Sequence, residues 1–170
     1  MGWKTSRLPS EFRIVSDFHI FRPATNADRS EIEDLVFSVL RSYGLEPSPD
    51  STDADLADIE ANYFSLGGAF DVLTDESGVI VGTVAVHHTE GSLCELRKMY
   101  LSPSCRGQGL GRRMMEHALT RAKELGFQQM WLETAESLKE AHGLYTKFGF
   151  SEFTGPHKSD RCDFALIRDL

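Results

Sequence analysis

The chain has few cysteines and no long hydrophobic run. Only three cysteines occur in 170 residues, Cys94, Cys105 and Cys162, and no two of them form a Cys-x-x-Cys pair. An odd, widely spaced set predicts neither a disulfide framework nor a zinc site, so a reducing compartment, the cytoplasm, is the simplest expectation. No apolar stretch approaches the roughly 20 residues that a membrane-spanning helix needs. We therefore expect no membrane partner.

Metal ligands at a suitable spacing are also lacking. The adjacent His87 and His88 lie in a predicted strand, where neighbouring side chains point to opposite faces of the sheet. One ion cannot easily use both imidazoles, so the sequence predicts no metal site.

Basic residues are scarce. Lysine and arginine total 18 against 26 aspartate and glutamate, which gives a net charge of -8. Phosphate backbones need a basic face, so we expect no nucleic-acid partner. The first residues, MGWKTSRLPSEF, lack the apolar core of a signal peptide. We interpret residues 1–16 as an irregular extension and residues 17–170 as a single domain with one hydrophobic core.

Hydrophobic periodicity predicts the order strand, two helices, three strands, helix, strand, helix, two strands. The predicted strands are 18–25, 69–74, 79–88, 93–101, 130–134, 150–155 and 162–170, and the predicted helices are 26–43, 52–64, 110–125 and 138–148. Tight turns join the three central strands, which makes them antiparallel. The strand–helix–strand crossover over 93–134 requires a parallel pair. The sequence therefore predicts an α/β fold: a mixed, mostly antiparallel sheet of about seven strands, one central parallel pair, and helices on both faces.

Two stretches stand out by charge. The predicted helix 52–64 carries Asp53, Asp55, Asp58 and Glu60. We interpret it as a solvated face, with attraction of a cationic ligand as the alternative. In contrast, the span from Leu96 to Met115 holds five basic residues and no acidic one.

Within that basic span, the sequence CRGQGLGRRMM places Gly107, Gly109 and Gly111 between the end of a strand and the start of a helix. The first N–H groups of a helix have no internal partner and attract anions, and glycines let a phosphate lie against the backbone. The alternative is a turn that only packs the helix on the strand. The pattern matches neither the Walker A loop nor the G-x-G-x-x-G fingerprint, so the motif points to another phosphate-bearing ligand.

The segment RGQGLG resembles the R/Q-x-x-G-x-G/A signature of the GNAT superfamily of N-acetyltransferases, and ELRKMYLSP and LYTKFGF resemble its central strand and a later helix end. The resemblance implies acetyl-CoA as donor and an amine as acceptor, on a small molecule, a peptide or a protein. It also makes a homodimer an expectation, because dimers are frequent in the superfamily. The resemblance implies backbone contacts of Met99, Tyr100 and Leu101 to the pantetheine arm. It further implies that backbone N–H groups hold the pyrophosphate, those of Arg106, Gly107, Gln108, Gly109, Leu110, Gly111 and Arg112.

Acetyl transfer to an amine needs a base for the attacking amine and an acid for the departing thiolate. The resemblance implies Tyr145 as the acid, and its helical spacing also fits a core residue. We expect Glu95 to accept the proton, with an ion pair to Arg97 or Lys98 as the alternative. Arg97 is also a candidate ligand for a carboxylate on the acceptor. Strand alternation predicts Glu95, Arg97 and Met99 on one face and Leu96, Lys98 and Tyr100 on the other.

One position departs from the resemblance, because Leu138 stands where many members have an asparagine that contacts the cofactor. The alternative function is a non-catalytic acyl-CoA-binding or regulatory module on the same fold.

Overall fold

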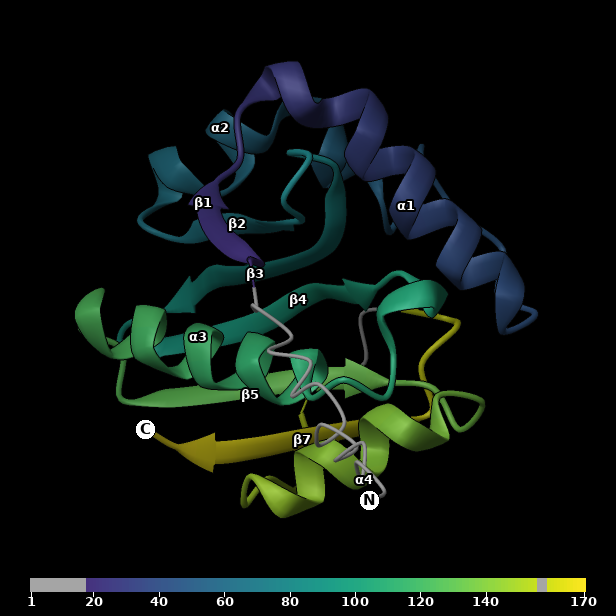
Figure 1. Ribbon diagram of the computed structural model, residues 1–170. Helices are drawn as coiled ribbons and strands as arrows, with labels where there is room; N and C mark the ends of the chain where they lie inside the picture. Colours follow the sequence, from purple (N-terminus) through teal and green to yellow (C-terminus); the bar gives the residue numbers. More distant parts are fainter. Residues whose placement is uncertain (1–17, 156–158) are drawn as a thin grey trace, which may run out of the picture.

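The computed structural model describes residues 18–155 and 159–170 (Figure 1). The extension predicted over residues 1–16 lies outside the described residues. No helix in the described ranges is long and apolar enough to cross a membrane.

The seven strands form one sheet in the order β1-β2-β3-β4-β5-β7-β6. Every neighbouring pair is antiparallel except β4 and β5, which are parallel. This confirms the predicted mixed sheet with one central parallel pair. The strands are β1 Ile20–Pro23, β2 Ala69–Thr74, β3 Ile80–Glu90, β4 Leu93–Leu101, β5 Gln129–Thr134, β6 Ser151–Glu152 and β7 Phe164–Asp169.

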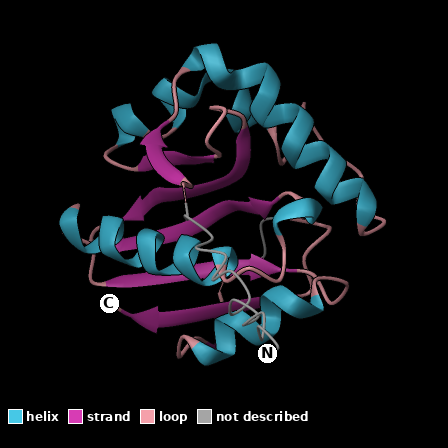
Figure 2. Ribbon diagram, in the orientation of Figure 1, coloured by secondary structure: helices cyan, strands magenta, loops and turns pink. Residues whose placement is uncertain are grey.

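Helices cover both faces of the sheet, and Figure 2 shows the strands as one layer among them. The helices are α1 Arg29–Ser42, α2 Ile59–Asn62, α3 Leu110–Glu124 and α4 Lys139–Lys147. On one face, Ile32, Val36 and Leu40 of α1 and Ile59 of α2 are buried against β2 and β3. On the other face, a buried stripe of α3 and Tyr145 of α4 pack on β3, β4 and β5. The sheet therefore separates two hydrophobic cores, and the apolar face of each helix packs into one of them.

The helix predicted over 52–64 is shorter than expected. It divides into a 3₁₀ turn at Ala54–Asp58, the four-residue α2, and another 3₁₀ turn at Phe64–Leu66. Asp58 interrupts the helix because its backbone is not helical and its carboxylate caps α2 by accepting a hydrogen bond from the Ala61 N–H. Leu56, Ile59 and Tyr63 are nevertheless fully buried, as their spacing predicts.

Strand β4 leaves its parallel neighbour after three residues. Leu93, Cys94 and Glu95 are the positions of β4 that pair with β5 in the described chain. Beyond Glu95, no strand within residues 18–155 and 159–170 pairs with the edge of β4 that faces β5. This opening is the feature of the fold that positions the functional site.

Strand β4 contains a β-bulge at Lys98, close to the end of its pairing with β5. The register between β3 and β4 shifts between Thr83 and Ala85, and Lys98 adopts a left-handed backbone with φ +50°. The Thr83 hydroxyl donates to the Lys98 carbonyl over 2.7 Å and holds the bulge in place.

The bulge reverses the alternation of side chains along β4. Leu96 lies in the core under α3, and Met99 packs against the same core, while Tyr100 packs with the core under α1. The prediction that Met99 shares a face with Glu95 and Arg97 is therefore wrong. The extra residue of the bulge shifts every later side chain to the opposite face.

Candidate functional site

Two cavities of similar size adjoin the opening between β4 and β5. The first, which we call the loop cavity, has a volume of about 300 Å³ and lies beside the glycine-rich segment and α4. The second, the polar cavity, has a volume of about 310 Å³ and extends towards Glu95, Asp55 and Arg161. Four residues line both cavities: Met99, Tyr100, Leu138 and Tyr145. The two cavities therefore meet at the bulged end of β4.

The glycine-rich segment presents a row of unused N–H groups. In the described chain, no acceptor is bonded to the backbone N–H groups of residues 107–112, and the first helical bond runs from Arg113 to the Gly109 carbonyl. Gly107 and Gly109 have φ values of +74° and +79°, a conformation that glycine adopts without steric cost. An added Cβ at either residue would have no heavy atom within 4 Å, so the space beside this backbone is open. This arrangement can bind an anion at the amino end of α3.

The predicted donor-site residues divide into two groups. Met99, Tyr100, Leu101, Arg106, Gly107, Gly111 and Arg112 line the loop cavity. Gln108, Gly109 and Leu110 do not. The Gln108 side chain donates to the Ser104 carbonyl at 3.3 Å, and the Leu110 side chain is buried in the core. The backbone N–H groups of these three residues still belong to the unused row.

The basic residues of the span do not act as one group. Arg106 stacks over the Tyr43 ring at 5.0 Å and Arg112 is largely exposed beside Glu116, and both line the loop cavity. Arg113 donates to the His19 carbonyl and does not line this cavity. Arg97 and Lys98 line the polar cavity instead. The charge count along the sequence therefore overstates the positive charge at the glycine-rich segment.

Tyr145 lies where the cavities meet and is also a core residue. The residue is 7% exposed, and its ring packs edge-to-face with Phe150. Among the described residues, none forms a hydrogen bond with its hydroxyl. Burial raises the pKa of Tyr145 above its usual value, with a smaller contribution from Cys162. Tyr145 therefore stays protonated at neutral pH. The position of Tyr145 is compatible with both interpretations from the sequence, a general acid and a core residue.

Two neighbours of Tyr145 share its environment. Tyr100 also lines both cavities, and burial raises the pKa of its phenol as well. Leu138 also lines both cavities. An aliphatic side chain therefore lies at the junction, at the position where the resemblance implies an asparagine.

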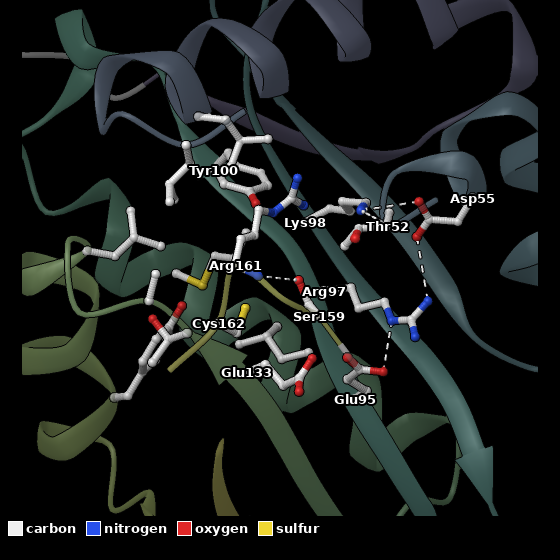
Figure 3. Close-up of a pocket in the computed structure, with 18 of the residues that line it drawn as sticks. Thr52, Asp55, Glu95, Arg97, Lys98, Tyr100, Glu133, Ser159, Arg161 and Cys162 are labelled. Atoms are coloured by element: carbon white, nitrogen blue, oxygen red, sulfur yellow. Dashed lines mark hydrogen bonds and ion pairs between the residues drawn. The ribbon is translucent and has the colours of Figure 1, made fainter. Parts of the chain in front are cut away.

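Figure 3 shows a network of charged side chains that crosses the polar cavity. Glu95 is 5% exposed, and its Oε2 accepts a hydrogen bond from Arg97 Nε at 2.8 Å. Arg97 Nη1 lies 3.6 Å from Asp55 Oδ2, which also accepts a hydrogen bond from the Tyr63 hydroxyl. The ion pair between Glu95 and Arg97 that the sequence left as an alternative is therefore present, and it lies inside the candidate site.

The network continues to the buried Asp53. Lys98 Nζ lies 2.8 Å from Asp53 Oδ1, and both terminal nitrogens of Arg161 donate to the same carboxylate at 2.8 Å. Burial alone would raise the pKa of Asp53, but the hydrogen bond from Arg161 and the charge of Lys98 outweigh it and hold this pKa well below its usual value. Asp53 therefore carries its charge at every ordinary pH.

The acidic segment over residues 52–64 is therefore not the solvated face that we predicted. Asp53 and Asp55 are paired inside the protein, whereas Asp58 and Glu60 hydrogen-bond to Asn26 on the surface. Sequence reasoning missed Arg161 entirely. Its partner Asp53 is 108 residues away in the sequence, and no local pattern connects the two.

Comparison with known proteins gives a consistent result. The model of the family described as "Acetyltransferase (GNAT) family" matches residues 32–150. The uncharacterized N-acetyltransferase YjgM of Escherichia coli K12 is 32% identical over 164 residues, which cover 92% of this chain and 98% of that protein.

Two solved structures share the fold. The acetyltransferase of GNAT family from Staphylococcus aureus Mu50 has a TM-score of 0.84 at 22% identity, and covers 89% of this chain and 98% of its own. A GNAT superfamily phosphinothricin acetyltransferase from Sinorhizobium meliloti, in complex with acetyl-CoA, has a TM-score of 0.71 at 24% identity, over 90% and 89% of the two chains.

Proposed function

This chain belongs to the acetyltransferase (GNAT) family and is an N-acetyltransferase, and from that premise we propose that it transfers an acetyl group from acetyl-CoA in the loop cavity directly to a primary amine in the polar cavity. The observation that carries this proposal is the junction of the two cavities at Met99, Tyr100, Leu138 and Tyr145. A thioester at the inner end of one cavity would meet an amine at the inner end of the other.

The donor side is supported by two sets of unused backbone groups. Beyond Glu95, no described strand pairs with the β4 edge that faces β5, and the peptide groups of Met99, Tyr100 and Leu101 can bond the amides of the pantetheine arm as a neighbouring strand would. The N–H groups of residues 107–112, with the dipole of α3, would hold the pyrophosphate. Arg106 and Arg112 would add positive charge at the mouth of this cavity.

The proposed reaction begins with the acceptor amine. An amine with an ordinary pKa of about 8 to 10.4 is mostly protonated at neutral pH and must lose a proton before it attacks. Glu95 would accept this proton, directly or through water, because its carboxylate lines the polar cavity. The amine nitrogen then forms a bond to the thioester carbonyl carbon.

The second half of the reaction breaks the carbon–sulfur bond. The departing thiolate would take its proton from the Tyr145 hydroxyl, which is protonated at neutral pH because burial raises its pKa. The attacking nitrogen carries one excess proton after it forms the new bond, and transfer of this proton to the Tyr145 phenolate, directly or through water, would give the neutral amide and restore the acid. Proton transfer by a positioned side chain typically accelerates a reaction by about 10²- to 10⁴-fold.

An acceptor screen tests this proposal. Release of free thiol from acetyl-CoA is followed with a panel of primary amines, and the N-acetylated product is identified by mass spectrometry. We expect one thiol per acetylated amine, and no thiol without an amine beyond slow hydrolysis. Tight acetyl-CoA binding with no transfer to any amine would instead favour the non-catalytic acyl-CoA-binding module.

A further inference from the structure

Three cationic side chains line the polar cavity among the described residues, and two of them are each held by several oxygens of the protein. Lys98 Nζ lies within 3.2 Å of three oxygens, from Thr52, Asp53 and Asp55. The terminal nitrogens of Arg161 bond both oxygens of Asp53 and the Glu46 carbonyl. A ligand anion would have to displace these partners to bind either side chain.

Arg97 is different. Of its five N–H groups, the one on Nε donates to Glu95 at 2.8 Å. Its terminal nitrogen Nη1 forms an ion pair with Asp55, whose Oδ2 lies 3.6 Å away, a distance too long for a hydrogen bond. In the described part of the chain, no hydrogen bond is made by either terminal nitrogen of Arg97.

The Arg97 guanidinium is also held in place and largely shielded from water. Its side chain is 24% exposed, lines the polar cavity and is fixed on one edge by the nearly buried Glu95. Charged donors that are mostly buried normally have hydrogen-bond partners, and an arginine fork matches the geometry of a carboxylate. The unused terminal nitrogens therefore form an oriented site for a planar anion.

We propose that the acceptor is a small amino acid and that Arg97 binds its carboxylate. This inference rests on the proposed function and names the substrate class of the same site. Arg97 precedes the bulge at Lys98 and Met99 follows it, and both residues line the polar cavity. A carboxylate on Arg97 would leave an amine a few bonds away close to the junction of the cavities, where the thioester is expected. A cavity of about 310 Å³ has room for a small amino acid.

The test compares amino acids with the amines that remain when the carboxylate is removed. Suitable pairs are serine with ethanolamine, ornithine with putrescine, and tyrosine with tyramine, extended to the other common amino acids. With the wild-type protein, we expect at least one amino acid to have a kcat/KM about tenfold or more above that of its partner amine, because a charge-assisted contact is lost with the carboxylate.

Variants of Arg97 make the test specific. In Arg97→Gln, we expect KM for the amino acid to rise about 10- to 100-fold more than KM for the partner amine. Loss of the hydrogen bond to Glu95 should lower kcat for both substrates by a similar factor. Arg97→Lys keeps the charge without the planar fork and should fall between the two. Arg41→Gln, on the exposed end of α1, is the matched control and should behave as wild type.

The decisive quantity is the change in the amino acid to amine ratio on mutation. Removal of the carboxylate also alters the pKa of the amine, and this difference cancels when the same pair is compared in two variants. Melting temperature and acetyl-CoA affinity are measured in parallel, and Arg97→Lys carries the test if Arg97→Gln does not fold.

Each outcome has a distinct meaning. A preference for the amino acid that disappears in Arg97→Gln supports the inference. An equal or better rate with the amines overturns it and leaves the proposed function intact, as does a preference that survives the substitution. Transfer to neither class, with acetyl-CoA still bound, overturns both proposals together.

Discussion

Replacement of Tyr145 by phenylalanine separates its role in catalysis from its role in the core. The substitution removes one oxygen atom, and among the described residues that oxygen has no hydrogen-bond partner to lose. The ring keeps its edge-to-face contact with Phe150 at 6.0 Å. We therefore expect the free energy of unfolding to change by less than about 0.5 kcal/mol, and the melting temperature by less than about 2 °C.

The catalytic effect should be much larger. Loss of a general acid lowers the rate by about 10²- to 10⁴-fold, which corresponds to roughly 3 to 5 kcal/mol of barrier. The assay measures kcat with an identified acceptor, acetyl-CoA affinity by calorimetry, and the melting temperature. Affinity for acetyl-CoA should change little, because the unused N–H row lies on another element.

Tyr100→Phe is the matched control, because Tyr100 also lines both cavities and has a raised pKa. We expect it to retain kcat within about threefold. If Tyr145→Phe stays within threefold of wild type, Tyr145 is a core residue and the reasoning is refuted. If Tyr100→Phe shows the large loss instead, the acid has been assigned to the wrong tyrosine.

Four further predictions follow from the site. Acetyl-CoA at 100 times its dissociation constant should raise the free energy of unfolding by about 2.7 kcal/mol and the melting temperature by roughly 5 to 10 °C. No change in melting temperature at millimolar acetyl-CoA would contradict the proposed donor site. Gly109→Val should abolish acetyl-CoA binding in a folded protein. Gly126→Val, with a similar positive φ at the other end of α3, should show the same strain and bind normally, and equal binding by both would contradict a phosphate cradle. Glu95→Gln should lower turnover mostly at low pH, where deprotonation of the amine is hardest, and an unchanged pH–rate profile would give Glu95 a structural role. Asp53→Asn should destabilise the fold by about 3 to 5 kcal/mol at neutral pH, because Lys98 and Arg161 lose a buried anion. Since the pKa of Asp53 is lowered in the fold, its contribution is complete above about pH 4 and falls as the pH drops further, so a gap between the two proteins that stays constant down to pH 2 would contradict the assignment.

Local patterns predicted most of the fold. Apolar residues at helical spacing identified the helix predicted over 26–43, which is α1, and two segments joined by a tight turn, 69–74 and 79–88, identified the hairpin of β2 and β3. The parallel pairing of β4 and β5 followed from the crossover, which needs a connection of this length. These features depend on residues that are close in the sequence, so a single sequence contains the information.

The errors came from contacts between distant residues. The bulge at Lys98 depends on Thr83 of the neighbouring strand, and the sequence of β4 alone does not predict it. Asp53 is buried because Lys98 and Arg161 meet it from 45 and 108 residues away. A run of acidic residues in a short polar segment looks solvated until these partners are known.

The candidate site shows the same division. The glycine-rich segment could be identified from sequence because its strand end, glycines and helix start are contiguous. The polar cavity could not, because its walls come from β4, β5 and loops that are separated in the chain. Glu95 and Arg97 were recognised as candidates, and their ion pair was one of two alternatives, but the choice of Arg97 over Lys98 and the terminal nitrogens of Arg97 without hydrogen bonds appear only in the structure.

The central claim is that donor and acceptor occupy the two adjoining cavities at the same time and that transfer between them is direct. Initial rates measured while both acetyl-CoA and the acceptor are varied test this claim most directly. Double-reciprocal lines that intersect are predicted, because both substrates must be bound before reaction. Parallel lines, with an acetylated protein isolated in the absence of acceptor, would indicate a covalent intermediate and contradict the account.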